Sequence, residues 1–291
     1  MRLRVSHTTA YSYSAPASLS QNEVYLTPRQ TATQQVLSSE LQLTPQPEYL
    51  HRRCDYFGNI AHVFMVQQGH RQLAVTAVSE VLTSAAPAVS PQATLAWEQV
   101  VERLGRHAAE DELAALQFSF ASPMVVVEEE VRAYAARSFP SGRAVLAGAL
   151  DLMGRIYGEF SYDKTASTVE TSVGEVLASR RGVCQDFAHL AIACLRSLGL
   201  AARYVSGYLQ TLPPPGRPRL VGADASHAWV ALYVPDVGWV DFDPTNNMPV
   251  GESHITVAWG RDYSDVAPVK GVVMGGGTHT LEVRVDVVQL G

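Results

Sequence analysis

The sequence predicts an α+β protein of two domains: an antiparallel β domain, then a domain in which a helix packs on an antiparallel sheet. Three observations support this. Through about residue 83, apolar and polar residues alternate in short runs, as in strands with one buried face. A proline-marked stretch of small residues, Ala85–Pro91, follows as a linker. Beyond it, apolar residues recur first at helical spacing and, after residue 206, at strand spacing.

The first domain is expected to span residues 1–90 and to be an antiparallel sheet. Its alternating runs lie at residues 3–5, 11–13, 36–43, 61–65 and 75–81. A turn is predicted at Gly58-Asn59, between two of these runs. Prolines fall between the runs, where strands tolerate them, and these are Pro16, Pro28, Pro45 and Pro47.

The second domain is expected to span residues 91–291, with its core motifs at 180–250. Four helical patterns precede the core motifs, at residues 95–105, 127–138, 144–158 and 172–178. Residues 213–216 (Pro-Pro-Pro-Gly) predict an exposed loop. Residues 281–287 alternate cleanly and predict a terminal strand.

Composition argues against several classes of function. The net charge is −6 and no run of Lys or Arg exceeds two residues, so nothing favours nucleic acid or an anionic membrane as a partner. No stretch approaches the ~20 continuous apolar residues of a membrane span. Residues 1–7 lack the apolar part of a secretory signal. Three cysteines cannot complete a disulfide framework. We therefore expect a cytoplasmic protein, with a homo-oligomer left open.

The most informative segment of the second domain is residues 180–199. From residue 185 its apolar residues recur at helical spacing with one buried face, which places Cys184 at the first turn of a helix. The positive end of the helix favours the thiolate that a nucleophile requires. Asp186, in the same turn, opposes this effect. The alternative is that Cys184 is a small buried hydrophobic residue, which is how we interpret Cys194; Cys54 is also interpreted as structural.

A histidine and an aspartate come together in the hairpin predicted for residues 226–245. Two strands are joined there by a turn. If Val234 pairs with Gly238, then His227 and Asp243 are diagonal neighbours on one face, within side-chain reach of each other. Such a carboxylate fixes the tautomer of the imidazole, while the other ring nitrogen serves a thiol.

Cys184, His227 and Asp243 are therefore the predicted catalytic triad. Two alternatives remain open at this point. A lone histidine on a strand is often a structural residue, and Asp241 has the same parity as Asp243, although it lies one pair further from His227. His189, about 140° round the helix from Cys184, is not expected to face the site.

Three segments resemble, in order, the core motifs of the transglutaminase-like superfamily, a papain-like group of cysteine enzymes. The resemblance implies an α+β core with the nucleophile helix packed on an antiparallel sheet. It also implies Cys184 as the nucleophile, His227 as the base and Asp243 as the orienting acid. The three segments are Gly182–Cys184, Ser226–Val230 and Gly238–Thr245.

More narrowly, the chain is similar to the bacterial members of this superfamily that carry an extra N-terminal β domain. Residues 201–209, 260–269 and 55–59 each resemble segments of that subgroup. Two positions depart from the common pattern. Ala231 stands where relatives often have glutamate, and Ala201 where they usually have proline. Neither departure touches the predicted triad.

The resemblance implies an acyl-thioester intermediate but does not fix the reaction. No calcium-loop motif is present, so we expect hydrolysis of an amide or peptide bond in a peptide or protein substrate. Transfer of a glutamine acyl group to an amine, and a non-enzymatic binding scaffold, are the alternatives. No C-x-x-C or H-E-x-x-H motif occurs, so we expect no metal and no cofactor.

The tetrahedral intermediate needs hydrogen-bond donors for its oxyanion. The backbone N–H of Cys184 is the first expected donor. Aromatic or amide side chains supply the second donor in relatives, and Tyr162 offers a phenolic hydroxyl in a segment upstream of the nucleophile helix. Tyr162 could instead be a core aromatic residue. Trp229, on the same strand face as His227, is the other residue expected to contribute to oxyanion or substrate binding.

Overall fold

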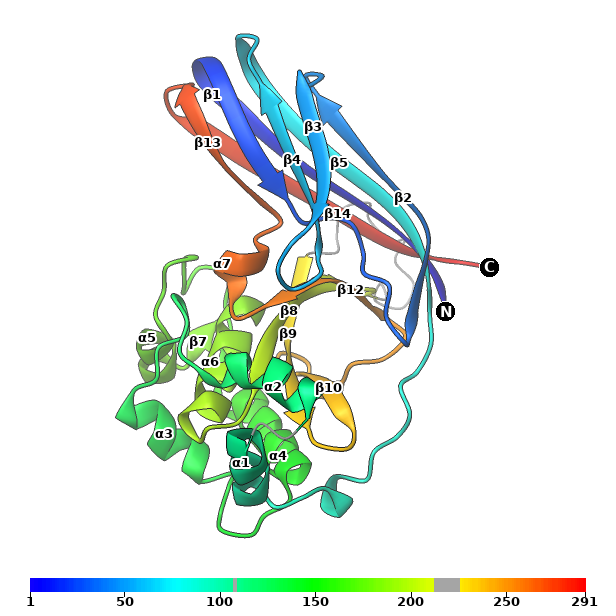
Figure 1. Ribbon diagram of the computed structural model, residues 1–291. Helices are drawn as coiled ribbons and strands as arrows, with labels where there is room; N and C mark the ends of the chain where they lie inside the picture. Colours follow the sequence, from blue (N-terminus) through cyan, green and yellow to red (C-terminus); the bar gives the residue numbers. More distant parts are fainter. Residues whose placement is uncertain (107–108, 212–225) are drawn as a thin grey trace, which may run out of the picture.

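The computed structural model describes residues 1–106, 109–211 and 226–291, and it has two parts (Figure 1). A curled antiparallel sheet forms one part, and a smaller sheet with the helices around it forms the other. The predicted α+β class is confirmed. The loop predicted at residues 213–216 lies outside the described residues.

The large sheet is built around β1 (Arg2–Val24), a strand of 23 residues. The two runs predicted at residues 3–5 and 11–13 both belong to this strand. One edge of β1 pairs with β5 (His70–Thr83) and then with β4 (Ile60–Val66). Its other edge pairs with β14 (His279–Leu290) and then with β13 (Val269–Gly275). The outer strands are β2 (Gln34–Thr44), on β5, and β3 (Tyr49–Cys54), on β4.

The strands beside β1 end or begin close to an irregularity in its middle. The register of β1 against β5 shifts between Ser12 and Ala17, and near this shift β4 ends at Val66 and β5 begins at His70. Between β13 and β14 the chain passes through Gly276 and Gly277, whose φ angles of 80° and 65° lie in the left-handed region that favours glycine. Pro16 lies within the break of β1, a position at which strands tolerate proline.

The division of the chain differs from the prediction at its C-terminal end. The last two strands, β13 and β14, pair with β1 and so belong to the N-terminal sheet. The second domain therefore does not run to residue 291 but lies between two parts of the β domain. The alternation of apolar and polar residues at 281–287 correctly predicted a strand. Such alternation shows which face of a strand is buried, but it does not identify the strand with which it pairs.

The second part contains a five-stranded antiparallel sheet and all seven α-helices of the described residues. The four helices predicted before the core motifs lie within two residues of their expected bounds; α2 and α7 were not predicted. No helix in the described ranges is long and apolar enough to cross a membrane. The helices are α1 (Trp97–Arg106), α2 (Glu110–Leu116), α3 (Glu129–Ala136), α4 (Val145–Glu159), α5 (Val173–Ser179), α6 (Cys184–Ser197) and α7 (Tyr263–Val266). The strands, in sheet order, are β11 (Met248–Pro249), β10 (Gly238–Asp243), β9 (Ser226–Val234), β8 (Ala202–Leu209) and β12 (His254–Gly260), and β6 (Ser161–Tyr162) pairs separately with β7 (Arg181–Gly182).

Helix α6 is the centre of this part. It packs on β8 and β9 on one side and on α3, α4 and α5 on the other. Every residue from 186 to 196 is buried, so the helix is enclosed on all faces rather than on the single face that the spacing predicted. The buried Arg196 is satisfied by backbone carbonyls, including that of Phe118 at 2.8 Å and that of Ala202 at 2.9 Å.

Two side-chain amides of the β domain hold β12, the edge strand of the smaller sheet. Gln34 Nε2 donates to the Thr256 carbonyl at 2.8 Å, and Gln34 Oε1 accepts the Thr256 N–H at 2.8 Å. Asn59 makes the same pair of bonds with Trp259, at 2.8 and 2.9 Å. Each amide takes the place of a residue in a neighbouring strand, so both parts of the molecule are joined through backbone hydrogen bonds of β12.

Replacing Asn59 by alanine is expected to destabilise the protein by about 2–4 kcal/mol, because the N–H and C=O groups of Trp259 lose their partners. The measurement is the shift of the urea unfolding midpoint relative to the unchanged protein. Gln72→Ala removes an exposed amide from β5 and is the control, with an expected change within about 0.5 kcal/mol. Equal midpoints for the two variants would contradict a role for Asn59 in joining the two parts.

Candidate active site

Cys184 is the first residue of α6, and the carboxylate of Asp186 caps the start of this helix. Asp186 Oδ2 accepts the N–H of Val183 at 2.7 Å and the hydroxyl of Ser167 at 2.5 Å. Gly182 is required beside the cap, since a Cβ there would lie 2.7 Å from Asp186 Oδ2. Burial raises the pKa of Asp186 although both hydrogen bonds oppose the shift. Asp186, which was expected to oppose the thiolate, therefore fixes the start of the helix that carries Cys184.

Tyr162 lies on β6, and its backbone pairs in parallel with Gly182, two residues before Cys184. Its side chain is 51% exposed. The pKa of Tyr162 is raised by partial burial and, after that, by the negative charges of Cys184 and Asp186. These features place the phenol in the electrostatic neighbourhood of the nucleophile. The role of Tyr162 as an oxyanion donor stays a prediction.

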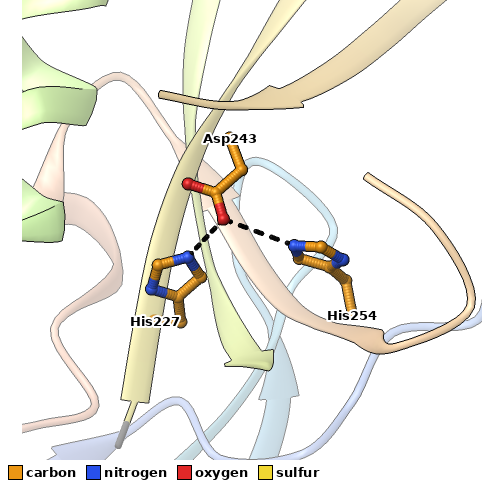
Figure 2. A group of neighbouring side chains, drawn as sticks. All are labelled: His227, Asp243 and His254. Carbon is orange, nitrogen blue, oxygen red and sulfur yellow. Dashed lines mark hydrogen bonds and ion pairs between the residues drawn. The ribbon is translucent and has the colours of Figure 1, made fainter. Parts of the chain in front are cut away.

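The hairpin of β9 and β10 has the predicted register. Val234 pairs with Gly238, and the ladder continues to Val230 opposite Phe242. Gly238 has a φ of 96°, which lets the turn close. At the open end of the hairpin, His227 Nε2 lies 2.7 Å from Asp243 Oδ2 (Figure 2). The predicted proximity of this pair is therefore confirmed.

His227 also interacts with Cys184, so one imidazole joins the thiol and the carboxylate. Burial disfavours a charge on His227, but hydrogen bonds to Asp243 and Cys184 and the negative charges of both outweigh it, and the pKa of His227 rises to about 10. Because Nε2 is engaged by Asp243, the other ring nitrogen is left for the sulfur. This geometry suits a thiolate–imidazolium pair held by a carboxylate.

Asp243 is fully buried and saturated with hydrogen bonds. Oδ1 accepts the N–H groups of Thr245 at 2.9 Å and Asn246 at 3.3 Å, and Oδ2 accepts the amide of Asn246 at 2.6 Å. His254 Nε2 lies 3.5 Å from the same Oδ2. Burial alone would raise the pKa of Asp243, but hydrogen bonds from His227, His254 and Asn246 and the charge of His227 hold it well below its ordinary value.

Asn246 and His254 are the two residues of this group that the sequence analysis missed. An aspartate side chain often accepts backbone N–H groups two and three residues further along and so forms a turn. The contact of Asn246 with Asp243 could therefore have been predicted from the local sequence. His254 had none. It comes from β12, which reaches Asp243 only after β8 and β9 are in place.

Asp241, the alternative third member, does not contact His227. Its pair across the hairpin is Ala231, and a carboxyl oxygen is buried. Burial raises the pKa of Asp241, opposed by the charge of Arg203 and then by the indole of Trp229. We interpret Asp241 as the counter-charge of the buried Arg203, whose guanidinium lies 3.7 Å from the Trp259 ring centre.

Trp229 occupies a different place from the one expected. Its side chain is 0% exposed, so it cannot offer a surface to a substrate in this conformation. The indole packs edge-on against His254, with ring centres 5.3 Å apart, and lies 6.2 Å from the ring centre of His227. It also fills the space above Gly207, where a Cβ would meet the ring at 2.5 Å. Trp229 is thus a buried residue that packs beside the imidazole rings of His227 and His254.

The other histidine and the two other cysteines considered from the sequence have surroundings of their own. His189 is buried against Tyr204, and its Nε2 accepts the N–H of Tyr263 at 3.2 Å. Desolvation lowers the pKa of His189 to about 4. Cys194 is fully buried, which raises its pKa to about 12, whereas Cys54 is exposed at the end of β3.

His227, Asp243 and His254 also form the one group of three metal-ligating side chains among the described residues, with ligand atoms within 4.8 Å of one another. Asp243 Oδ2 already accepts hydrogen bonds at 2.6 and 2.7 Å. A cation at this oxygen would have to displace both donors. The contacts are those of a proton-holding network, and they fit a metal ion less well.

Comparison with known proteins gives two sequence-family matches. The bacterial transglutaminase-like N-terminal region matches residues 3–82, and the transglutaminase-like superfamily matches residues 132–244. An uncharacterized protein of Mycobacterium bovis is 40% identical over 295 residues, covering 99% of this chain and 92% of its own length. An uncharacterized protein of Mycobacterium leprae is 36% identical and covers 99% of both chains.

A shorter match and a solved structure complete the comparison. A protein-glutamine gamma-glutamyltransferase of Pseudomonas aeruginosa is 40% identical over 68 residues, which is 23% of this chain and 10% of that protein. The crystal structure of a candidate cysteine protease from Cytophaga hutchinsonii superimposes with a TM-score of 0.78 at 22% identity, covering 100% of this chain and 91% of the other. That likeness concerns the fold, and it spans both parts of the molecule. Because two regions of the chain match family models and its relatives are similar over nearly their full length, the chain belongs to the transglutaminase-like superfamily. Residues 3–82 are its bacterial N-terminal region.

Proposed function

We propose that the protein is a cysteine hydrolase that cleaves an amide bond of a peptide or protein through an acyl-thioester intermediate. The observation that carries the proposal is the hydrogen bond of His227 to the buried carboxylate of Asp243 at 2.7 Å, with Cys184 near enough to raise the pKa of the same imidazole. Superfamily membership supports it. A structural role alone would not need a thiol at a helix start facing a charged imidazole.

In the proposed reaction, the Cys184 thiolate attacks the carbonyl carbon of the amide and forms the C–S bond. The tetrahedral intermediate collapses, the C–N bond breaks, and the His227 imidazolium gives its proton to the leaving nitrogen. Neutral His227 then takes a proton from water as the water attacks the thioester. The C–S bond breaks, the acid is released and the thiolate–imidazolium pair returns. Asp243 keeps the imidazole oriented throughout and stabilises its charge.

The oxyanion of each tetrahedral intermediate needs donors that are already in place. The backbone N–H of Cys184 is free for this role because it lies at the start of α6, where the first N–H groups have no partner within the helix. Tyr162 is proposed as the second donor because β6 and β7 hold it beside the nucleophile segment. Its half-exposed phenol is accessible to a substrate.

Acyl transfer to an amine is the second candidate. It uses the same thioester, with an amine in place of water as the second nucleophile. The 68-residue similarity to a protein-glutamine gamma-glutamyltransferase favours it. Both reactions depend on the same three side chains, so only the fate of the thioester separates them.

An N-protected glutaminyl peptide supplied with a fluorescent primary amine tests both reactions at once. Hydrolysis is expected to release ammonia with little amine incorporated, and a Cys184→Ala variant is expected to do neither. Stoichiometric incorporation of the amine would favour the transferase. If peptide libraries of wider composition also give no turnover that depends on Cys184, the hydrolase proposal is wrong.

Cys184 is expected to be alkylated before the other two cysteines. Brief treatment with iodoacetamide at pH 7, followed by peptide mass spectrometry, gives the order. Cys54 is the informative competitor because it is exposed but has no imidazole partner among the described contacts, while Cys194 is shielded by burial. A His227→Ala variant should slow the modification of Cys184 and leave that of Cys54 unchanged. Faster modification of Cys54 in the unchanged protein would argue for a scaffold.

Asp243→Asn is expected to lower turnover by roughly 10⁴-fold, because an amide in place of a triad carboxylate favours the wrong imidazole tautomer. Asp241→Asn should lose much less activity, since Asp241 faces Arg203 and does not contact His227. Thermal unfolding of both variants separates an effect on catalysis from one on stability. A larger catalytic loss at Asp241 would show that the third member has been misassigned.

A further inference from the structure

His254 is a second imidazole beside the Asp243 carboxylate. Figure 2 shows the two imidazoles approaching the same carboxylate oxygen from different directions. The distance from Oδ2 is 2.7 Å to His227 Nε2 and 3.5 Å to His254 Nε2. The second contact lies at the outer limit of a hydrogen bond, and hydrogen bonds in catalytic groups are often long before substrate binds.

The surroundings of His254 fix which nitrogen carries its proton. Nδ1 accepts the backbone N–H of Gly251 at 3.3 Å and lies 3.4 Å from the hydroxyl of Ser253. A backbone N–H can only donate, so Nδ1 presents its lone pair. The neutral imidazole therefore carries its proton on Nε2, the atom that faces Asp243.

The contact is shielded from water, which strengthens it. The side chains of both His254 and Asp243 are 0% exposed. Among the described residues, Asp241 is a second carboxyl group near His254, and the ring centre of His227 lies 6.3 Å from that of His254. Among the described residues, the buried Nε2 of His254 makes no hydrogen bond of normal geometry, and it faces Asp243 Oδ2 at 3.5 Å. A small approach of the two groups would satisfy a donor that is otherwise buried without a partner.

His254 is also held firmly from behind. It is the first residue of β12 and pairs with Leu209 of β8. The indole of Trp229 stands edge-on against its ring. Further along β12, the side-chain amide of Gln34 makes two hydrogen bonds with the backbone of Thr256. The β domain therefore fixes the strand that carries His254.

We propose that His254 is a positioning residue, which holds the Asp243 carboxylate from a second direction and so keeps it aligned when His227 carries a positive charge. This inference rests on the proposed function. It extends the triad to a chain of four side chains, Cys184, His227, Asp243 and His254. His254 contacts the carboxylate of Asp243, and its ring centre lies 6.3 Å from that of His227, so it is placed to act through Asp243 and not on the reacting atoms.

The test compares His254→Phe, which keeps a ring but loses the donor, with His254→Gln, whose amide can donate near the position of Nε2. The Phe variant is expected to lose roughly 10–100-fold in kcat, the size of one hydrogen bond to a charged group, with KM unchanged. The Gln variant should recover most of the loss. His7→Phe is the matched control: His7 is equally buried and bonded to Tyr208 at 3.0 Å, but in the β domain.

A second readout needs no substrate. The proton between His227 and Asp243 should give a downfield NMR signal, assigned by its loss in His227→Ala. It is expected to disappear in His254→Phe and to persist in His254→Gln and His7→Phe. An unchanged signal and unchanged kcat in His254→Phe would overturn the proposal. If the Phe variant does not fold, His254→Asn, whose amide is too short to reach Asp243, takes its place.

The two proposals fail in different ways. Turnover that does not depend on Cys184 would reject the hydrolase, while the NMR signal would still decide the role of His254. Conversely, an active enzyme in which His254→Phe behaves like the His7 control would leave the hydrolase intact and reject the positioning role.

Discussion

A carboxylate without access to water is costly unless donors surround it, and Asp243 is such a group. Its donors come from three separate places in the chain: His227 on β9, the turn after β10, and, at longer range, His254 on β12. The smaller sheet must bring β9, β10 and β12 into register before this charge is satisfied. The fold is therefore stable only when the site has this geometry. The same contacts stabilise the core and align the imidazole of His227.

Cys184, the proposed nucleophile, is positioned by a second carboxylate, that of Asp186. Asp186 turns back to the N–H of Val183 and needs the open space of Gly182, so the start of α6 is defined to a single residue. The rest of the helix is enclosed by sheet and helices, which leaves it little freedom to rotate or slide. One buried carboxylate thus fixes the start of the helix that carries Cys184, and another fixes the imidazole of His227.

Local sequence patterns predicted most of this arrangement. Contacts between residues distant in sequence could not be predicted from them. The register of the 226–245 hairpin followed from a short turn, so His227 and Asp243 could be paired from sequence alone. The helix before Gly199 followed from its spacing. What failed depends on partners distant in sequence: the place of β14 beside β1, the contact of His254 with Asp243, and the enclosure of Trp229. A strand pattern shows which face is buried, but not what covers that face or which edge it joins.

The position of β1 has a consequence for the order in which the chain can fold during synthesis. One edge of this strand meets β5 and β4 within the first 83 residues, but the other waits for residues 269–290. The second part of the molecule lies between these segments and is synthesised before the strands that close the sheet. Until residues 269–290 are available, a long edge of β1 presents unpaired N–H and C=O groups to any other nascent chain. The chain is therefore most prone to mispairing in the interval after the second part has been synthesised and before the large sheet is complete.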